Sequence, residues 1–105
     1  MTDVCVVLVT APSAEKAGEL AHVLVEEKLA ACVNIVPQVR SIYRWEGAVQ
    51  DESESVMVVK TTAARFDALH QRVLALHPYS VPEVLRLDVA AGHLPYLDWV
   101  RESTR

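Results

Sequence analysis

The chain has 105 residues, of which 51% are hydrophobic and 23% are charged, and this composition predicts one soluble globular domain spanning residues 1–105. The net charge is −4 and Lys and Arg form no cluster, which argues against nucleic acid as a partner. No apolar run approaches the ~20 residues that span a bilayer, and the chain opens directly into a strand, so we expect no membrane partner and a cytoplasmic location.

The first predicted strand, residues 4–9, is apolar on both of its faces, which is typical of a central strand. Ser13 is a good N-cap for a helix that runs to about residue 28, with an apolar stripe from Ala17 to Val25. The two cysteines, Cys5 and Cys32, have no zinc-site spacing, so we expect both to be reduced small hydrophobic residues.

The next stretch, residues 32–61, has the pattern of one very long β-hairpin. Residues 33–45 are rich in β-branched and aromatic side chains, a turn follows at 46–48, and the return strand runs over 49–61. Pro37 lacks an N–H group, so its strand must be an edge strand or contain a bulge. A loop formed by residues 47–48 predicts three cross-strand pairs: Arg44 with Asp51, Tyr43 with Glu52, and Val39 with Val56.

The length of this hairpin predicts self-association. About 13 residues per strand give an arm of ~43 Å, whereas a domain of this size has a diameter of only ~34 Å. The arm should therefore extend beyond the domain, and its unpaired edges need cover. An identical neighbour in a closed ring supplies that cover, so we expect a homo-oligomer.

The remaining elements complete an α+β domain. A second helix over 63–76 begins at a Thr61 or Thr62 cap and ends at His77, because Pro78 follows. A strand over 83–90 and a short helix over 96–102 come last. The order βαββαβ plus a C-terminal helix predicts a ferredoxin-like fold with the first and third strands in the middle of the sheet. One apolar sheet face would then need cover from a neighbouring copy.

The best candidate for a functional segment is residues 76–83, in which two prolines stiffen the link between helix and strand. Glu83 shares the parity of Leu85 and Leu87, so its carboxylate should point inward and needs a cation such as Lys60, an arginine or a metal ion. His77 and Glu83 are ligand types of zinc and copper sites. A structural ion pair at Glu83 explains the same residues equally well.

Catalytic motifs are absent from the sequence. It contains no GxSxG, no HExxH and no phosphate-binding glycine loop, and an acylphosphatase would need an arginine in the loop 10–15, which has none. We therefore expect a protein that is not an enzyme.

Several blocks of residues are specific when taken together. They are Thr-Ala-Pro at 10–12, Glu-Lys-Leu-Ala-Ala-Cys-Val-Asn at 27–34, Tyr-Arg-Trp-Glu-Gly at 43–47, Lys-Thr-Thr at 60–62, His-Pro-Tyr-Ser-Val-Pro-Glu at 77–83 and Tyr-Leu-Asp-Trp at 96–99. In this order they closely resemble the CutA family of divalent-cation tolerance proteins over nearly the whole chain. The resemblance implies a ferredoxin-like subunit, a tight homotrimer built by the long hairpins, and an association with copper and other divalent cations.

The resemblance transfers a metal site only in part. The three copper ligands of a bacterial family member correspond to Val9, Leu76 and His77, so one of the three is present. The fold and trimer that the resemblance implies are similar to those of the PII signalling proteins, which indicates binding and signalling rather than turnover.

The leading hypothesis is a trimeric, CutA-like divalent-cation tolerance protein that responds to metal ions. It binds copper, zinc or another divalent cation, or a small molecule, in clefts between subunits, and needs no cofactor to fold. The predicted metal ligands are His77 and Glu83, and the predicted ligand-pocket residues are Tyr43, Trp45, Lys60 and Tyr79. The alternative is a PII-like signalling or interaction scaffold that binds a protein partner without metal, and a small hydrolase ranks third.

Overall fold

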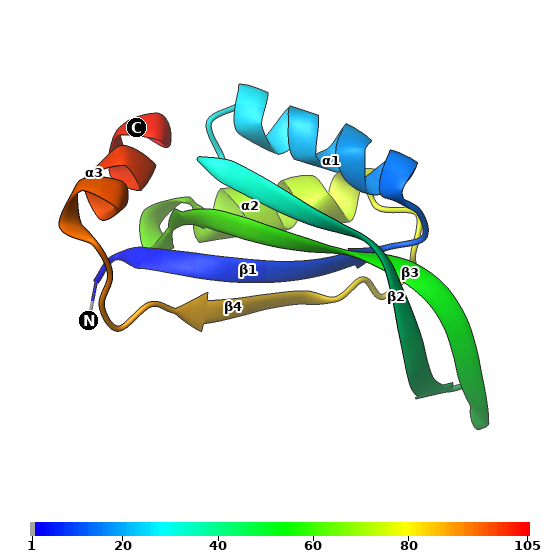
Figure 1. The fold of residues 1–105 in the computed structure, drawn as a ribbon. Coiled ribbons are helices and arrows are strands. Elements are labelled where there is room, and N and C mark those ends of the chain that lie inside the picture. The colour runs from blue at the N-terminus through cyan, green and yellow to red at the C-terminus, as the bar shows by residue number, and fades with distance from the viewer. Residues whose placement is uncertain (1) are drawn as a thin grey trace.

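A four-stranded antiparallel sheet carries two helices on one face and a third helix at one end (Figure 1). The computed structural model describes residues 2–105. Its elements are β1 (Val4–Ala11), α1 (Ala14–Glu26), β2 (Cys32–Trp45), β3 (Ala48–Thr62), α2 (Ala63–Leu76), β4 (Val84–Asp88) and α3 (Leu94–Ser103). The sheet order is β2-β3-β1-β4, so the prediction that the first and third strands lie in the middle is confirmed.

The ends of the helices have local causes. Ser13 caps α1 as predicted, and its Oγ accepts a hydrogen bond of 3.1 Å from the N–H of Lys16. The helix ends at Glu26 rather than near residue 28, because Lys28 has a positive φ of 59° that the helix cannot contain. Thr62 occupies the N-cap position of α2, but its hydroxyl forms no capping hydrogen bond, and the helix ends at Leu76 as predicted.

The main core lies between the sheet and the helices α1 and α2. Alternate residues of β1 and β3 are fully buried on this face, including Val7 and Val59. They pack with buried leucines of α1 and with Leu69 and Val73 of α2. Val25, predicted to lie on the buried stripe of α1, is 42% exposed instead.

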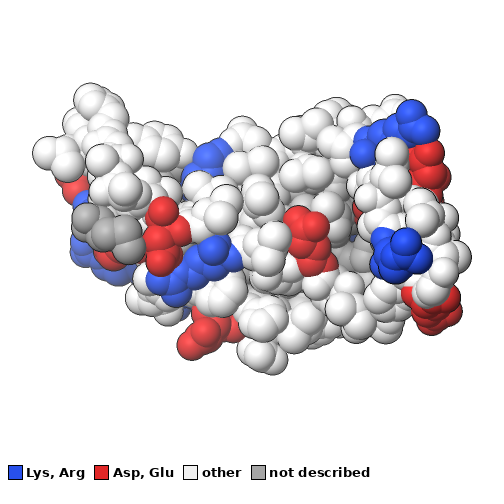
Figure 2. All heavy atoms as spheres, turned by 90° about the horizontal axis from the view of Figure 1, so that it is seen from below, with Lys and Arg blue, Asp and Glu red and all other residues white. Residues whose placement is uncertain are grey.

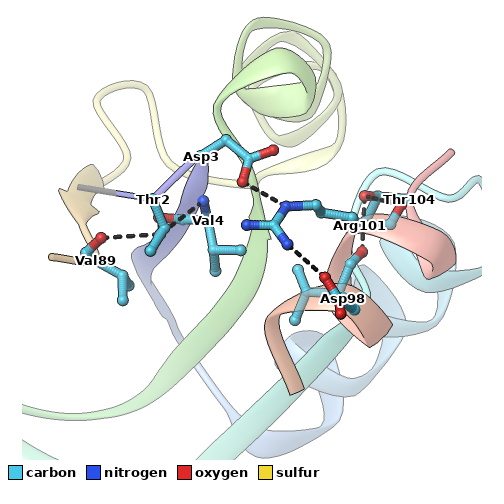
Figure 3. A network of polar contacts seen from close by, with 8 residues as sticks. Thr2, Asp3, Val4, Val89, Asp98, Arg101 and Thr104 are labelled. Atoms are coloured by element: carbon cyan, nitrogen blue, oxygen red, sulfur yellow. Dashed lines mark hydrogen bonds and ion pairs between the residues drawn. The ribbon is translucent and has the colours of Figure 1, made fainter. Parts of the chain in front are cut away.

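A second, smaller core joins α3 to the N-terminal end of the sheet. It contains Val4, Ala31, Leu97 and Val100, all buried. A polar network closes over this end (Figure 3): the Arg101 guanidinium donates to the Asp3 carboxylate at 2.6 Å and to Asp98 at 2.8 Å, and the Thr2 hydroxyl donates to the Val89 carbonyl at 2.9 Å.

The hairpin has a different register from the predicted one. Trp45 pairs with Ala48, so the two-residue loop is Glu46-Gly47 rather than residues 47–48. Both loop residues have positive φ, 50° and 79°, as a type I′ hairpin turn requires. The three predicted pairs are therefore wrong: Arg44 pairs with Val49, Tyr43 with Gln50, and Val39 with Glu54.

A bulge interrupts β2 at Pro37. The register shifts between Val36 and Val39, where β2 has one residue more than β3. The Ser55 hydroxyl donates a hydrogen bond of 2.6 Å to the Pro37 carbonyl at this point. The sequence predicted that Pro37 lies either on an edge strand or at a bulge. Both hold, because β2 is an edge strand and contains this bulge.

The distal half of the hairpin projects as an arm beyond the end of β1. The pairing of β1 with β3 ends at Ala11 and Ser55, so residues 39–45 and 48–54 pair only with one another. The arm curves toward the sheet face that lacks helices (Figure 1). The whole molecule has a longest extent of 44 Å, against 25 and 22 Å across.

The sheet face opposite α1 and α2, called the open face below, is apolar and lacks a helix in the part of the chain described. Val6 and Leu8 of β1 and Val58 of β3 lie on it only partly buried, and Leu85 and Leu87 of β4 are 53% and 52% exposed. White, uncharged surface makes up much of this side, although an acidic residue lies near its middle (Figure 2).

The strand β4 spans Val84–Asp88 and is shorter than the predicted 83–90. Glu83, expected to point to the inner side, is exposed. The leucines of its parity face the open side, whereas Arg86 lies on the helix side, 5.7 Å from the centre of the Phe66 ring. Within residues 2–105 no helix has the length and apolar character needed to cross a membrane.

Candidate functional site

A cavity of about 580 Å³ lies between the arm and the link that connects α2 to β4. This volume is within the range of sites for small molecules. The side chains that line it and carry chemistry are Tyr43, Trp45, Glu52, Glu54, Tyr79 and Glu83. Four of them, Tyr43, Trp45, Tyr79 and Glu83, are predicted site residues that the fold brings together.

The curvature of the hairpin creates this cavity. Tyr43, Glu52 and Glu54 lie on the same side of the arm. Every second residue of a strand points to the same face, so Tyr43 shares a face with Ser41, and Glu54 with Glu52. Ser41 pairs directly with Glu52, which places all of them on one side. Residues of this side line the cavity together with Tyr79, Ser80, Val81 and Glu83 of the link after α2. The two prolines of the link, Pro78 and Pro82, restrict the backbone that presents Tyr79.

Two tyrosines bind two glutamates at the cavity wall. The Tyr79 hydroxyl donates to Glu54 Oε2 at 2.8 Å, and the Tyr43 hydroxyl donates to Glu52 Oε2 at 3.1 Å. Burial, followed by the hydrogen bond to Glu54, raises the pKa of the Tyr79 phenol above its ordinary value. Burial and then the hydrogen bond to Glu52 raise the pKa of Tyr43 as well. Both phenols therefore stay protonated as donors near neutral pH.

Glu54 is the unusual member of this wall, since it is only 8% exposed. Its Oε2 accepts the Tyr79 hydrogen bond, while no Lys, Arg or His in the described chain forms an ion pair with it. By residue type alone, Glu54 belongs to an ordinary acidic stretch of β3. Its location depends on the register, which the sequence did not reveal.

His77 does not line the cavity but contacts the backbone of Tyr79, which does. It is 8% exposed, and its Nδ1 accepts a hydrogen bond of 3.1 Å from the Tyr79 N–H. The proton must then be on Nε2, which lies 2.7 Å from the Thr10 carbonyl and donates to it. Both ring nitrogens are thus occupied by backbone groups, so His77 positions Tyr79 and has no free lone pair for a metal ion.

The predicted metal pair does not form a site by itself. Glu83 is exposed at the cavity rim, and His77 faces Thr10 and the Tyr79 backbone. Across residues 2–105, no three side chains of His, Cys, Asp or Glu lie close enough to hold a metal ion. The donor set of one subunit therefore does not fit a copper or zinc ion, and the metal role of His77 and Glu83 stays a prediction.

Lys60 lies away from the cavity. It is six residues beyond Glu54 along β3, a separation of ~20 Å, and its Nζ lies 3.9 Å from the sulfur of Cys32. Cys32 and Cys5 are both free thiols, and burial raises the pKa of Cys5. The cavity of one subunit thus contains three of the four predicted pocket residues.

These features define the class: an α+β domain with one antiparallel sheet, an extended hairpin arm and an acidic, aromatic cavity at the base of that arm. Residues 5–103 match the family model of the CutA1 divalent ion tolerance protein. The chain belongs to this family, and the resemblance seen in its sequence is confirmed.

Relatives with known names and structures support the assignment. The chain is 57% identical over 99 residues to the divalent-cation tolerance protein CutA of Thermus thermophilus, covering 94% of this chain and 96% of that protein. It is 49% identical over 100 residues to the chloroplastic protein CutA 1 of rice, covering 95% of this chain but only 56% of that longer protein. The crystal structure of CutA from Xylella fastidiosa superposes with a TM-score of 0.96 at 36% identity, covering 99% of this chain and 100% of that one.

Proposed function

We propose that this chain is a binding protein rather than an enzyme, and that its cavity at the base of the arm takes a small ligand. The observation that carries the proposal is that two residues of β2, Tyr43 and Trp45, and two of the link after α2, Tyr79 and Glu83, line one cavity of about 580 Å³. Among the lining residues, no serine or threonine has a histidine beside it. The two hydroxyl groups that do bind carboxylates are tyrosines whose pKa values are raised, which disfavours them as nucleophiles.

The proposal includes a homotrimer of ferredoxin-like subunits. The element order and the sheet order β2-β3-β1-β4 support the ferredoxin-like classification. The exposed leucines of the open face and the projecting arm support self-association, because both need cover. The arm of one subunit would then close the cavity of the next, which would make the cavity an intersubunit cleft.

A divalent cation is the second candidate ligand. It is favoured by what the relatives are called, divalent-cation tolerance proteins. Since His77 has no free ring nitrogen, copper or zinc would have to bind Glu83 together with donors from another subunit, or displace a backbone contact of His77. A metal site at the cavity would link the chain to a response to metal ions in the cytoplasm.

Titration calorimetry separates these candidates. Cu(II) and Zn(II) are titrated into tag-free wild type and His77→Ala, and a metal site at His77 predicts heat in the wild type that the variant lacks. The small-ligand proposal is tested by the fluorescence of Trp45 in a Trp99→Phe background, screened against cationic, anionic and neutral metabolites. A response lost in Tyr43→Ala supports the cavity, and no response to any compound contradicts it.

The alternative is a PII-like signalling or interaction scaffold that binds a protein partner and no metal. The exposed, aromatic-tipped arm is the feature that favours it. A truncated arm that loses a co-purifying protein while Trp45 remains insensitive to small molecules would support this alternative.

A further inference from the structure

The cavity at the base of the arm has a strongly one-sided charge. Among its eleven lining residues there are three glutamates, Glu52, Glu54 and Glu83, and no Lys, Arg or His. The ion pair of the arm between Arg40 and Asp51 involves residues outside this lining set. Within one subunit, the negative charge of the cavity is therefore not balanced by a basic group in its wall, and it favours a cationic occupant.

Glu54 is the most deeply buried of the three glutamates that line the cavity. More than nine-tenths of the residue is buried, and its Oε1 accepts no hydrogen bond from residues 2–105. A carboxylate at this depth is costly unless a cation or several donors compensate it. Tyr79 supplies one neutral donor and no cation in residues 2–105 pairs with Glu54, so its charge is available to a cationic occupant of the cavity.

The other walls are aromatic, with the rings of Tyr43, Trp45 and Tyr79 lining the cavity. Tyr43 is 38% exposed and Trp45 43% exposed, so part of each ring is free to contact a ligand. Aromatic faces attract ammonium groups, and tryptophan does so most strongly. A combination of carboxylates and aromatic rings is the usual protein environment for an organic ammonium group.

The shape of the site favours a molecule over a bare metal ion. No three acidic, histidine or cysteine side chains within residues 2–105 converge at metal-ligand distance. Glu52 and Glu54 each accept a hydrogen bond from a tyrosine and lie two residues apart on β3, ~7 Å. The carboxylates thus line the cavity without converging on one point, which suits a small molecule better than a bare ion.

We propose that this cavity binds a small organic cation, a molecule with a quaternary or protonated amine, with Glu54 as charge partner and Tyr43, Trp45 and Tyr79 around the ammonium group. This inference rests on the proposed function, because it specifies the chemical class of the ligand that the cavity takes.

The test compares choline with dimethylbutanol, its neutral isostere in which carbon replaces the ammonium nitrogen. Both are titrated calorimetrically into the full chain, in wild type, Glu54→Gln and Glu26→Gln. The Glu54→Gln variant keeps an oxygen to accept the Tyr79 hydrogen bond, and Glu26→Gln, at the end of α1 and outside the cavity, makes the same change in net charge. Circular dichroism verifies the fold of each variant.

The proposal predicts that wild type binds choline at least about tenfold more tightly than the isostere. Glu54→Gln should abolish this preference, whereas Glu26→Gln should keep it. If Glu54→Gln does not fold, Trp45→Leu on the exposed arm serves as the second variant and should weaken choline binding by about tenfold.

Equal affinity for choline and the isostere overturns the inference, yet it leaves the proposed ligand cavity standing. Absence of choline binding overturns the inference as well. If, in addition, Trp45 fluorescence responds to no compound at all, the proposed function fails together with it. An equal loss of choline binding in Glu26→Gln and Glu54→Gln would also overturn the inference, because it would assign the effect to net charge.

Discussion

The Tyr79 hydroxyl donates a hydrogen bond of 2.8 Å to the buried carboxylate of Glu54, and this contact joins the link after α2 to the point where β3 leaves the domain. Behind it, His77 fixes the Tyr79 backbone through its Nδ1. The base of the arm is therefore held by a short chain of polar contacts, and the cavity wall depends on it.

Removing this hydrogen bond should destabilise the protein. We expect Tyr79→Phe to lower the free energy of unfolding by about 1–3 kcal/mol, because it leaves a buried carboxylate without its donor. The matched control is Tyr43→Phe, which removes a hydrogen bond to the exposed Glu52 and should cost clearly less than Tyr79→Phe. Urea denaturation of both variants at one fixed protein concentration measures the difference. Equal losses would show that the burial of Glu54 does not matter.

Stability should fall at alkaline pH because of Tyr79. Burial and Glu54 raise its pKa in the folded state above the ordinary value of about 10. The stabilisation is then fully present below about pH 10 and is lost as the pH rises through the folded-state pKa. We expect the free energy of unfolding to decrease between about pH 9 and about pH 11 by more in wild type than in Tyr79→Phe. Identical pH profiles would contradict this assignment.

His77 should act as a positioning residue. We expect His77→Ala to lower the free energy of unfolding by about 1–3 kcal/mol, because the Tyr79 N–H and the Thr10 carbonyl each lose a partner. His70, half-buried beside Phe66 on α2 and without a hydrogen bond from its ring among the described residues, is the control position. Thermal unfolding followed by circular dichroism checks both, and a loss in His70→Ala as large as that in His77→Ala would argue against a special role for His77.

The hairpin loop offers a stabilising substitution. Glu46 has a φ of 50°, which asparagine tolerates better than glutamate and which favours an Asn-Gly turn. We expect Glu46→Asn to raise the free energy of unfolding by about 0.5 kcal/mol, and Gly47→Ala, at φ 79°, to lower it by about 1 kcal/mol. Denaturant midpoints measure both changes. Destabilisation by Glu46→Asn would contradict the type I′ turn.

The open face should fail to associate when it carries a charge. Leu85→Lys places an ammonium group on a side chain that is 53% exposed in one subunit, and we expect it to reduce the assembly to single subunits. Leu74→Lys, on α2 at 43% exposure and on the other side of the sheet, should leave the assembly intact. Size-exclusion chromatography with light scattering compares them, and an unchanged mass in Leu85→Lys would exclude this face from the interface.

Much of the fold could be predicted because its signals are local. The strands β1 and β3 are apolar on both faces at their paired segments, which placed them in the middle of the sheet, and Ser13 marked the start of α1. The hairpin register could not be predicted, because nothing in the sequence requires Glu46 to adopt a positive φ. An error of one residue in the loop then changed every cross-strand pair.

Part of the candidate site could also be predicted from local signals in the sequence. Tyr43, Trp45, Tyr79 and Glu83 stood out by residue type near a turn and a stiff link. The role of Glu54 depends on the register and on the bend at Pro37, neither of which composition reveals. The engagement of both His77 nitrogens depends on the Thr10 carbonyl, a contact across 67 residues of sequence.

The central claim is that the arm and the open face are covered by copies of the same chain. Light scattering on dilute, tag-free wild type tests it most directly. We predict a single species with about three times the subunit mass of 11.6 kDa. A well-folded species of 11.6 kDa, with the circular dichroism of an intact sheet, would contradict it.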